Sequence, residues 1–146
     1  MYLLHRIGLV KTFLYFFIPL MVLTPDYYKA LISGFPDLSF IQGAIIPIGL
    51  ATAYLYRRNW KPRFMDIVII SLAGVAIASE YKASGYADAQ NYIVDMVCYI
   101  VFPYVIGRLL IEQNGLRIEV VRRLVFFAAI AVILMAYEWR FAVNLY

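Results

Sequence analysis

The feature that most constrains this chain is a series of five apolar stretches separated by short polar segments. An α-helix needs about 20 predominantly apolar residues to cross the hydrocarbon core of a bilayer, and each stretch reaches or approaches that length. Apolar residues make up 64% of the 146 residues, which is well above the usage of a soluble domain. The pattern predicts an all-α, polytopic transmembrane helical bundle over residues 1–146, without a separate soluble domain. Its spans are expected at about 7–23, 39–56, 64–80, 92–111 and 124–138.

The basic residues predict how these spans are oriented. Most of the 13 Lys and Arg residues lie at the start of the first stretch or on the segments after the second and fourth stretches. Because short loops rich in Lys and Arg stay in the cytoplasm, we expect a cytoplasmic N-terminus and an external C-terminus. The formal net charge of +4 then reflects contact with anionic lipid headgroups rather than nucleic-acid binding. The residues on the predicted inner side are Arg6, Lys11, Arg57, Arg58, Lys61, Arg63, Arg108, Arg117, Arg122 and Arg123, against Lys29, Lys82 and Arg140 outside.

Four ionisable residues near the predicted helix ends are candidates for function, as such residues are by default in membrane proteins. Asp66 and Asp95 are expected in the first turns of the third and fourth helices, where a carboxylate complements the helix dipole. Asp66 can also pair with Arg63, three residues earlier. Arg108 is expected to end the fourth helix and to extend its charged group to the interface. Glu138 closes the fifth helix, where the dipole opposes a negative charge, so it needs a stabilising partner or a functional role.

Other classes of chemistry find no support in the sequence. The single cysteine, Cys98, cannot form an intramolecular disulfide, and the single histidine, His5, has no cluster of ligands near it in the sequence. We therefore expect no metal site and no cofactor. There is no Gly-rich phosphate loop and no nucleophile elbow. The acidic residues lie in loops or near helix ends, which disfavours an autonomous pump or channel.

Two prolines and a stripe of small residues predict how the helices bend and pack. Pro47 and Pro103 fall inside the second and fourth helices, where each removes a backbone donor and is expected to produce a kink. Ser71, Gly74 and Ala78 share one face of the third helix, a pattern that suits close helix packing.

The last third of the chain carries a resemblance to a known family. The sequence Phe102-Pro103-Tyr104-Val105-Ile106-Gly107-Arg108 precedes a short basic segment, an apolar helix, Tyr137-Glu138-Trp139 and a closing Asn144. This order resembles that of bacterial O-antigen ligase and O-antigen polymerase-like membrane proteins. In that family a Pro-Tyr-x-x-x-Arg-like helix end is followed by one span that finishes in an aromatic-Glu motif with a downstream Asn. The resemblance covers about residues 92–146 at the level of motifs, and residues 1–91 agree only in topology.

The resemblance implies a multi-pass, glycosyltransferase-like protein of the bacterial inner membrane that handles polyprenyl-diphosphate-linked glycan in the assembly of cell-surface polysaccharide. It makes Arg108 and Glu138 candidate substrate-binding residues. It provides no catalytic residue, because family members carry those residues on a large outer loop that has no counterpart in this sequence. We therefore expect the N-terminal portion of a longer protein, with further membrane helices as partners. The alternative is a small non-enzymatic membrane scaffold or accessory subunit, which the brevity of the chain and its lack of catalytic groups favour.

Overall fold

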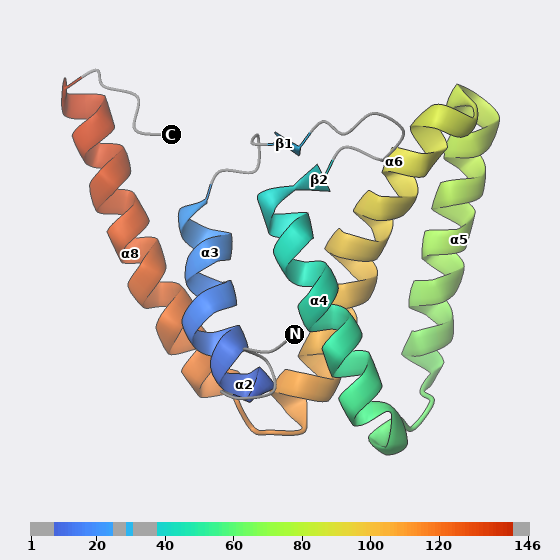
Figure 1. The fold of residues 1–146 in the computed structure, drawn as a ribbon, viewed down its shortest axis with the longest axis horizontal. Helices are drawn as coiled ribbons and strands as arrows, with labels where there is room; N and C mark the ends of the chain where they lie inside the picture. The colour runs from blue at the N-terminus through green and yellow to red at the C-terminus, as the bar shows by residue number, and fades with distance from the viewer. Residues whose placement is uncertain (1–7, 25–28, 31–37, 142–146) are drawn as a thin grey trace.

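The computed structural model describes residues 8–24, 29–30 and 38–141, and this part is all-α apart from one pair of two-residue strands. Five helical segments follow one another and run alternately in opposite directions (Figure 1). The first segment comprises α2 (Leu9–Thr12), the π-helical η1 (Phe13–Phe17) and α3 (Ile18–Leu23). The second is α4 (Phe40–Tyr56), which is followed by the short 3₁₀ turn η2 (Arg57–Asn59), and the third is α5 (Phe64–Ser84). The fourth comprises α6 (Tyr86–Met96), the π-helical η3 (Val97–Val101), α7 (Phe102–Val105) and the π-helical η4 (Ile106–Glu112), and the fifth is α8 (Arg117–Phe141).

The predicted all-α class is confirmed, but three helices extend further than the apolar stretches. α5 continues to Ser84, the fourth segment begins at Tyr86 and α8 begins at Arg117. The polar residues between the apolar stretches remain helical because helix formation keeps their backbone groups hydrogen-bonded. Consequently the third and fourth segments are separated only by Gly85, which adopts φ +84°, a conformation that glycine tolerates at no steric cost. Residue 7, where the first span was expected to begin, lies outside the described residues.

Local signals in the sequence fix several of the helix ends. Ser39 accepts a hydrogen bond from the backbone N–H of Gln42, whose side chain accepts one from the Ser39 N–H at 2.8 Å. This capping box starts α4 one residue after the strand β2 (Leu38–Ser39), which pairs antiparallel with β1 (Lys29–Ala30). The chain turns between η4 and α8 at Gly115, with φ +64°, as its glycine predicts.

Two prolines coincide with wide helical turns. Pro103 lies in α7, between the π-helical stretches η3 and η4, and Pro19 comes two residues after η1 ends. A proline ring crowds the carbonyl group four residues earlier, and a π turn gives that carbonyl more room. Pro47 behaves differently, since α4 continues as one α-helix through it.

The core lies among the first, second and fourth segments and the start of α8. Its most completely buried members include Ile18, Cys98 and Leu110. Helix α4 approaches the fourth segment closely at Gly49, where an added Cβ would lie 2.3 Å from a carbon of the Phe102 ring. The predicted packing stripe on α5 is wrong: Ser71, Gly74 and Ala78 are exposed, and a Cβ at Gly74 would meet no atom within 4 Å. Helix α5 buries Ala73 instead.

The helices form an open row rather than a closed bundle, with α8 and α5 at its two edges (Figure 1). α8 packs against α3, and α5 packs against α6. In the part of the chain that the structure describes, two helices are long and apolar enough to cross a membrane, Phe64–Ser84 and Asp88–Glu112, and Leu9–Leu23 is a shorter apolar helix.

Candidate functional site

The basic residues of the described chain gather at one end of the helices. The lower end in Figure 1 contains α2, η2, the segment before α5, η4 and the first turns of α8. Lys82 and Arg140 lie near the far ends of α5 and α8, and Lys29 is in β1, at the same upper end. The lower end, which we call the basic end, holds Lys11, Arg57, Arg58, Lys61, Arg63, Arg108, Arg117, Arg122 and Arg123.

The centre of the basic end is the buried carboxylate of Asp66, in the first turn of α5. Its Oδ2 accepts hydrogen bonds from the backbone N–H of Arg63 at 2.8 Å and from the Trp60 indole N–H at 3.3 Å. Its Oδ1 accepts hydrogen bonds from the Tyr104 hydroxyl and from the Arg108 guanidinium. A carboxylate has about four acceptor positions, so its hydrogen-bonding capacity is filled by the protein itself.

The buried partner of Asp66 is Arg108, not Arg63 as the sequence spacing predicted. Only 8% of the Arg108 side chain is exposed, so the expected extension of its charge to the interface is wrong. Its second terminal nitrogen donates to the main-chain carbonyl of Lys61, and the guanidinium lies 5.4 Å from the centre of the Trp60 ring. The Asp66–Arg108 pair therefore fastens the segment before α5 to η4.

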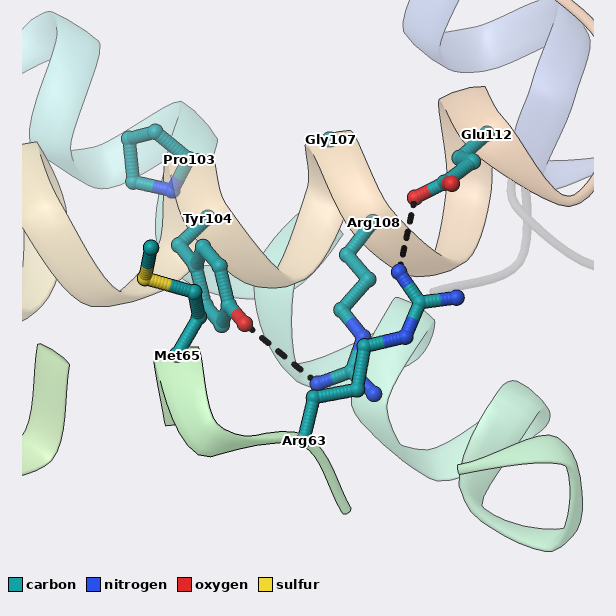
Figure 2. Close-up of a pocket in the computed structure, with 7 residues that line it drawn as sticks. All are labelled: Arg63, Met65, Pro103, Tyr104, Gly107, Arg108 and Glu112. Atoms are coloured by element: carbon teal, nitrogen blue, oxygen red, sulfur yellow. Dashed lines mark hydrogen bonds and ion pairs between the residues drawn. The ribbon is translucent and has the colours of Figure 1, made fainter. Parts of the chain in front are cut away.

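Tyr104 completes this arrangement because it lies one helical turn before Arg108. Figure 2 shows both side chains pointing toward the start of α5, with the Tyr104 hydroxyl 3.3 Å from an Arg108 nitrogen. The hydroxyl donates to Asp66 and accepts from Arg108, so all three polar side chains are satisfied. We refer to Asp66, Tyr104 and Arg108 as the buried ionic lock. A carboxylate with all its acceptor positions occupied is poorly placed to act as a general base.

Exposed ion pairs surround the lock. Glu112 lies 3.7 Å from Arg63 and 3.6 Å from Arg117, as Figure 2 shows for Arg63. Glu119, in the first turn of α8, lies 2.8 Å from Arg123, which is the i,i+4 geometry expected of a helical pair. Each of these ion pairs contributes little to stability. Together they neutralise only part of the positive charge at the basic end.

Glu138 and Arg108 do not meet. Arg108 lies in η4 at the basic end, whereas Glu138 lies in the last turns of α8 at the opposite end. The 21 residues from Arg117 to Glu138 correspond to about 30 Å of helix. These two candidate substrate-binding residues therefore cannot contact one small ligand within this chain. Glu138 is not without a partner in the structure.

A separate polar contact lies among the helices nearer the upper end. The Gln42 amide donates to Asp95 at 2.6 Å, which joins α4 to the fourth segment. The sequence predicted Asp95 in the first turn of its helix, and this is wrong, because α6 begins nine residues earlier, at Tyr86. Within the described residues there is no group of three or more His, Cys, Asp and Glu that could hold a metal ion.

A comparison of the chain with protein-family models, with curated proteins and with solved structures finds no match.

Sequence reasoning identified Asp66 and Arg108 individually but missed that they pair. They are 42 residues apart, and no local spacing rule connects them. One feature of the sequence could have indicated the pairing. Asp66 begins one helix and Arg108 ends the next, so in an antiparallel pair of helices the two residues lie at the same end. The sequence did not predict Trp60 and Tyr104 as polar partners of Asp66, since an indole and a phenol carry no charge that marks them, and Tyr104 entered only as part of the family motif.

Proposed function

We propose that this chain is an integral membrane protein with five spans, its basic end in the cytoplasm and its C-terminal end outside. The observation that carries this proposal is the exposure of large apolar side chains along the two edge helices, for example Ile70 at 65% and Ile133 at 68%. Soluble proteins rarely expose contiguous apolar surface on this scale, and lipid removes the penalty for doing so. The exposed apolar residues of these helices include Phe64, Met65, Ile67, Leu72 and Val75 on α5, and Ile118, Val121, Val125, Phe126, Val132 and Met135 on α8.

The orientation is supported by the distribution of charge between the two ends, through the preference of Lys and Arg for the cytoplasmic side. Single cysteines at Asn59 and Ala83, in a Cys98→Ala background, test it in intact bacterial cells. We expect a membrane-impermeant thiol reagent to label position 83 and to label position 59 only after lysis. Labelling of position 59 in intact cells would reverse the orientation, and equal labelling of both would contradict the membrane topology.

We further propose that the chain is the membrane portion of an O-antigen ligase- or polymerase-like protein, which handles polyprenyl-diphosphate-linked glycan. The support is the Pro-Tyr-x-x-x-Arg motif and what its residues do. Tyr104 and Arg108 lie one helical turn apart, and both donate a hydrogen bond to the Asp66 carboxylate. This shared partner is a physical reason for the spacing of the motif. Arg108 then acts as a positioning residue, and Glu138 is the substrate-binding candidate at the outer end.

Deletion of the gene in its bacterial host tests the glycan proposal. We expect surface polysaccharide to fall and the polyprenyl-diphosphate-linked glycan to accumulate in lipid extracts, with both restored by the wild-type gene. A deletion strain with unchanged surface polysaccharide and an unchanged lipid-linked pool would refute this role.

One observation favours a non-enzymatic accessory subunit as the second candidate. The apolar faces of α5 and α8 lie at open edges of the row, where further helices of another protein can pack. Photocrosslinking from position 70 or 133 in membranes distinguishes the two. A specific membrane-protein adduct, together with normal glycan pools in the deletion strain, would establish the accessory role.

A further inference from the structure

Two cavities meet at the basic end, beside the buried ionic lock. The first, of about 430 Å³, lies between η2, the segment before α5 and η4, and its charged walls are Arg58, Lys61, Arg63, Arg108 and Glu112. The second, of about 310 Å³, shares Arg63, Arg108 and Glu112 with the first. Its remaining walls are Met65, Pro103, Tyr104 and Gly107 (Figure 2). The pair of cavities therefore passes from a cationic region to a largely apolar one.

Positively charged side chains outnumber negatively charged ones on the walls of the first cavity. Arg108 is paired with Asp66, and Arg63 lies 3.7 Å from Glu112. Arg58 and Lys61 are exposed and have no ion pair with any acidic residue of the described chain. When Asp66, the partner of Arg108, is counted with Glu112, four cations face two carboxylates, so an excess of two positive charges remains, on Arg58 and Lys61. The buried lock holds the Lys61 main chain and η4 in fixed positions around it. This is the chemistry that binds an anion with several oxygen atoms.

The apolar cavity decides between a free anion and a lipid. Met65 is 59% exposed, on a face of α5 that lipid would cover, and Gly107 leaves open space, since a Cβ there would meet no atom within 4 Å. A soluble anion makes no favourable contact with the apolar walls of the second cavity. A lipid, by contrast, can place its phosphate among the cations and an acyl chain along Met65, Pro103 and Gly107. Basic pockets at the cytoplasmic ends of membrane helices are suited to anionic headgroups.

We propose that these two cavities form one binding site for an anionic phospholipid, with the headgroup phosphate between Arg58, Lys61 and Arg63. The site lies at the opposite end of the helices from Glu138. The inference rests on the proposed membrane insertion, but it is independent of the glycan role.

Native mass spectrometry of the purified full chain in detergent, titrated with phosphatidylglycerol, tests the site. Removing one cation near an anionic lipid surface weakens binding roughly fivefold, so Arg58→Gln/Lys61→Gln is expected to weaken phosphatidylglycerol binding about 25-fold. The matched control is Arg57→Gln/Arg122→Gln, which removes the same charge from exposed side chains that line neither cavity and do not pair with Glu112. This control is expected to change binding less than threefold, because its charges lie outside the site.

A second variant tests the acyl chain without changing the charge. Gly107→Leu fills the apolar cavity, and it is expected to weaken phosphatidylglycerol binding at least fivefold, while the helical circular dichroism of the chain stays unchanged. Phosphatidylcholine is expected to bind at least tenfold more weakly than phosphatidylglycerol. Inorganic phosphate at millimolar concentration is not expected to displace the bound lipid.

Several results would overturn the inference. Equal losses in the two double variants would mean a diffuse charge effect and no site. Full binding by Gly107→Leu, or displacement of the lipid by inorganic phosphate, would mean an anion site without a lipid chain. Equal binding of phosphatidylcholine would remove the role of the cations. A chain that stays soluble and monodisperse without detergent would overturn the proposed membrane insertion as well, whereas loss of the lipid site alone leaves the glycan proposal standing.

Discussion

Breaking the buried ionic lock is expected to lower the free energy of unfolding by an amount that depends on which partner is removed. Arg108→Met leaves Asp66 with three donors, from Tyr104, Trp60 and the Arg63 main chain, so the loss is expected to be about 3 kcal/mol. Asp66→Ala leaves a buried guanidinium without its carboxylate and removes the acceptor of three further donors. Its loss is expected to be larger, about 5 kcal/mol.

The combination of the two changes provides the sharpest test. Arg108→Met/Asp66→Ala is expected to be more stable than Asp66→Ala alone, because the double variant contains no buried unpaired charge. Unfolding of the purified chain in mixed detergent micelles, followed by circular dichroism, measures all three free energies. Arg117→Met is the control: its guanidinium is exposed and lies 3.6 Å from Glu112, so a change of at most about 1 kcal/mol is expected. The reasoning is refuted if Arg108→Met is no more destabilising than Arg117→Met.

Three further outcomes follow from contacts elsewhere in the fold. Gly49→Ala is expected to lower the free energy of unfolding by about 1–3 kcal/mol through overpacking, whereas Gly43→Ala, in the same helix with open space around it, should not destabilise; equal effects would contradict the close approach. Asp95→Leu removes the charged acceptor of the Gln42 amide and leaves the capping box of α4 in place, so it is expected to cost about 1.5–3 kcal/mol in the same assay, and a change below about 0.5 kcal/mol would argue against that contact. In the full-length protein, Glu138→Gln is expected to lower glycan transfer at normal abundance, with Glu138→Asp intermediate; full activity of Glu138→Gln would remove its functional assignment.

The helices could be predicted from the sequence because each is an apolar stretch long enough to be recognised without knowledge of its neighbours. α4 lies within one residue of the predicted range 39–56. The ends of α5 and α6 were not predictable by hydropathy, since polar residues such as Lys82 and Asp88 continue a helix whenever the backbone stays hydrogen-bonded. Hydropathy reports which residues lipid or the core can accept, and it does not report where helical hydrogen bonding stops.

The candidate site was predictable only in its parts. The sequence identifies Asp66 and Arg108 as ionisable residues near helix ends, but local rules assign each a solitary role. Their pairing depends on the antiparallel placement of α5 beside the fourth segment and on the rotation of both helices. The π turns around Pro103 change that rotation in a way that a constant helical period does not describe. The small-residue stripe on α5 did not predict a close contact: Gly74 and Ala78 face α6 across a cavity of about 520 Å³, whereas Gly49 and Phe102 make a close approach.

The contact between α3 and α8 has a consequence for the order in which the molecule is built. α5 and α6 are consecutive, so they can pair as soon as the second of them leaves the ribosome. Ile18 of α3, by contrast, precedes the start of α8 by about 100 residues, which at 5–20 residues per second is a delay of roughly 5–20 s. During that interval the surface of α3 that later receives α8 has no helix of this chain to cover it. Biogenesis of this protein therefore includes a period in which α3 waits for α8, and any helper of membrane insertion would act at that surface.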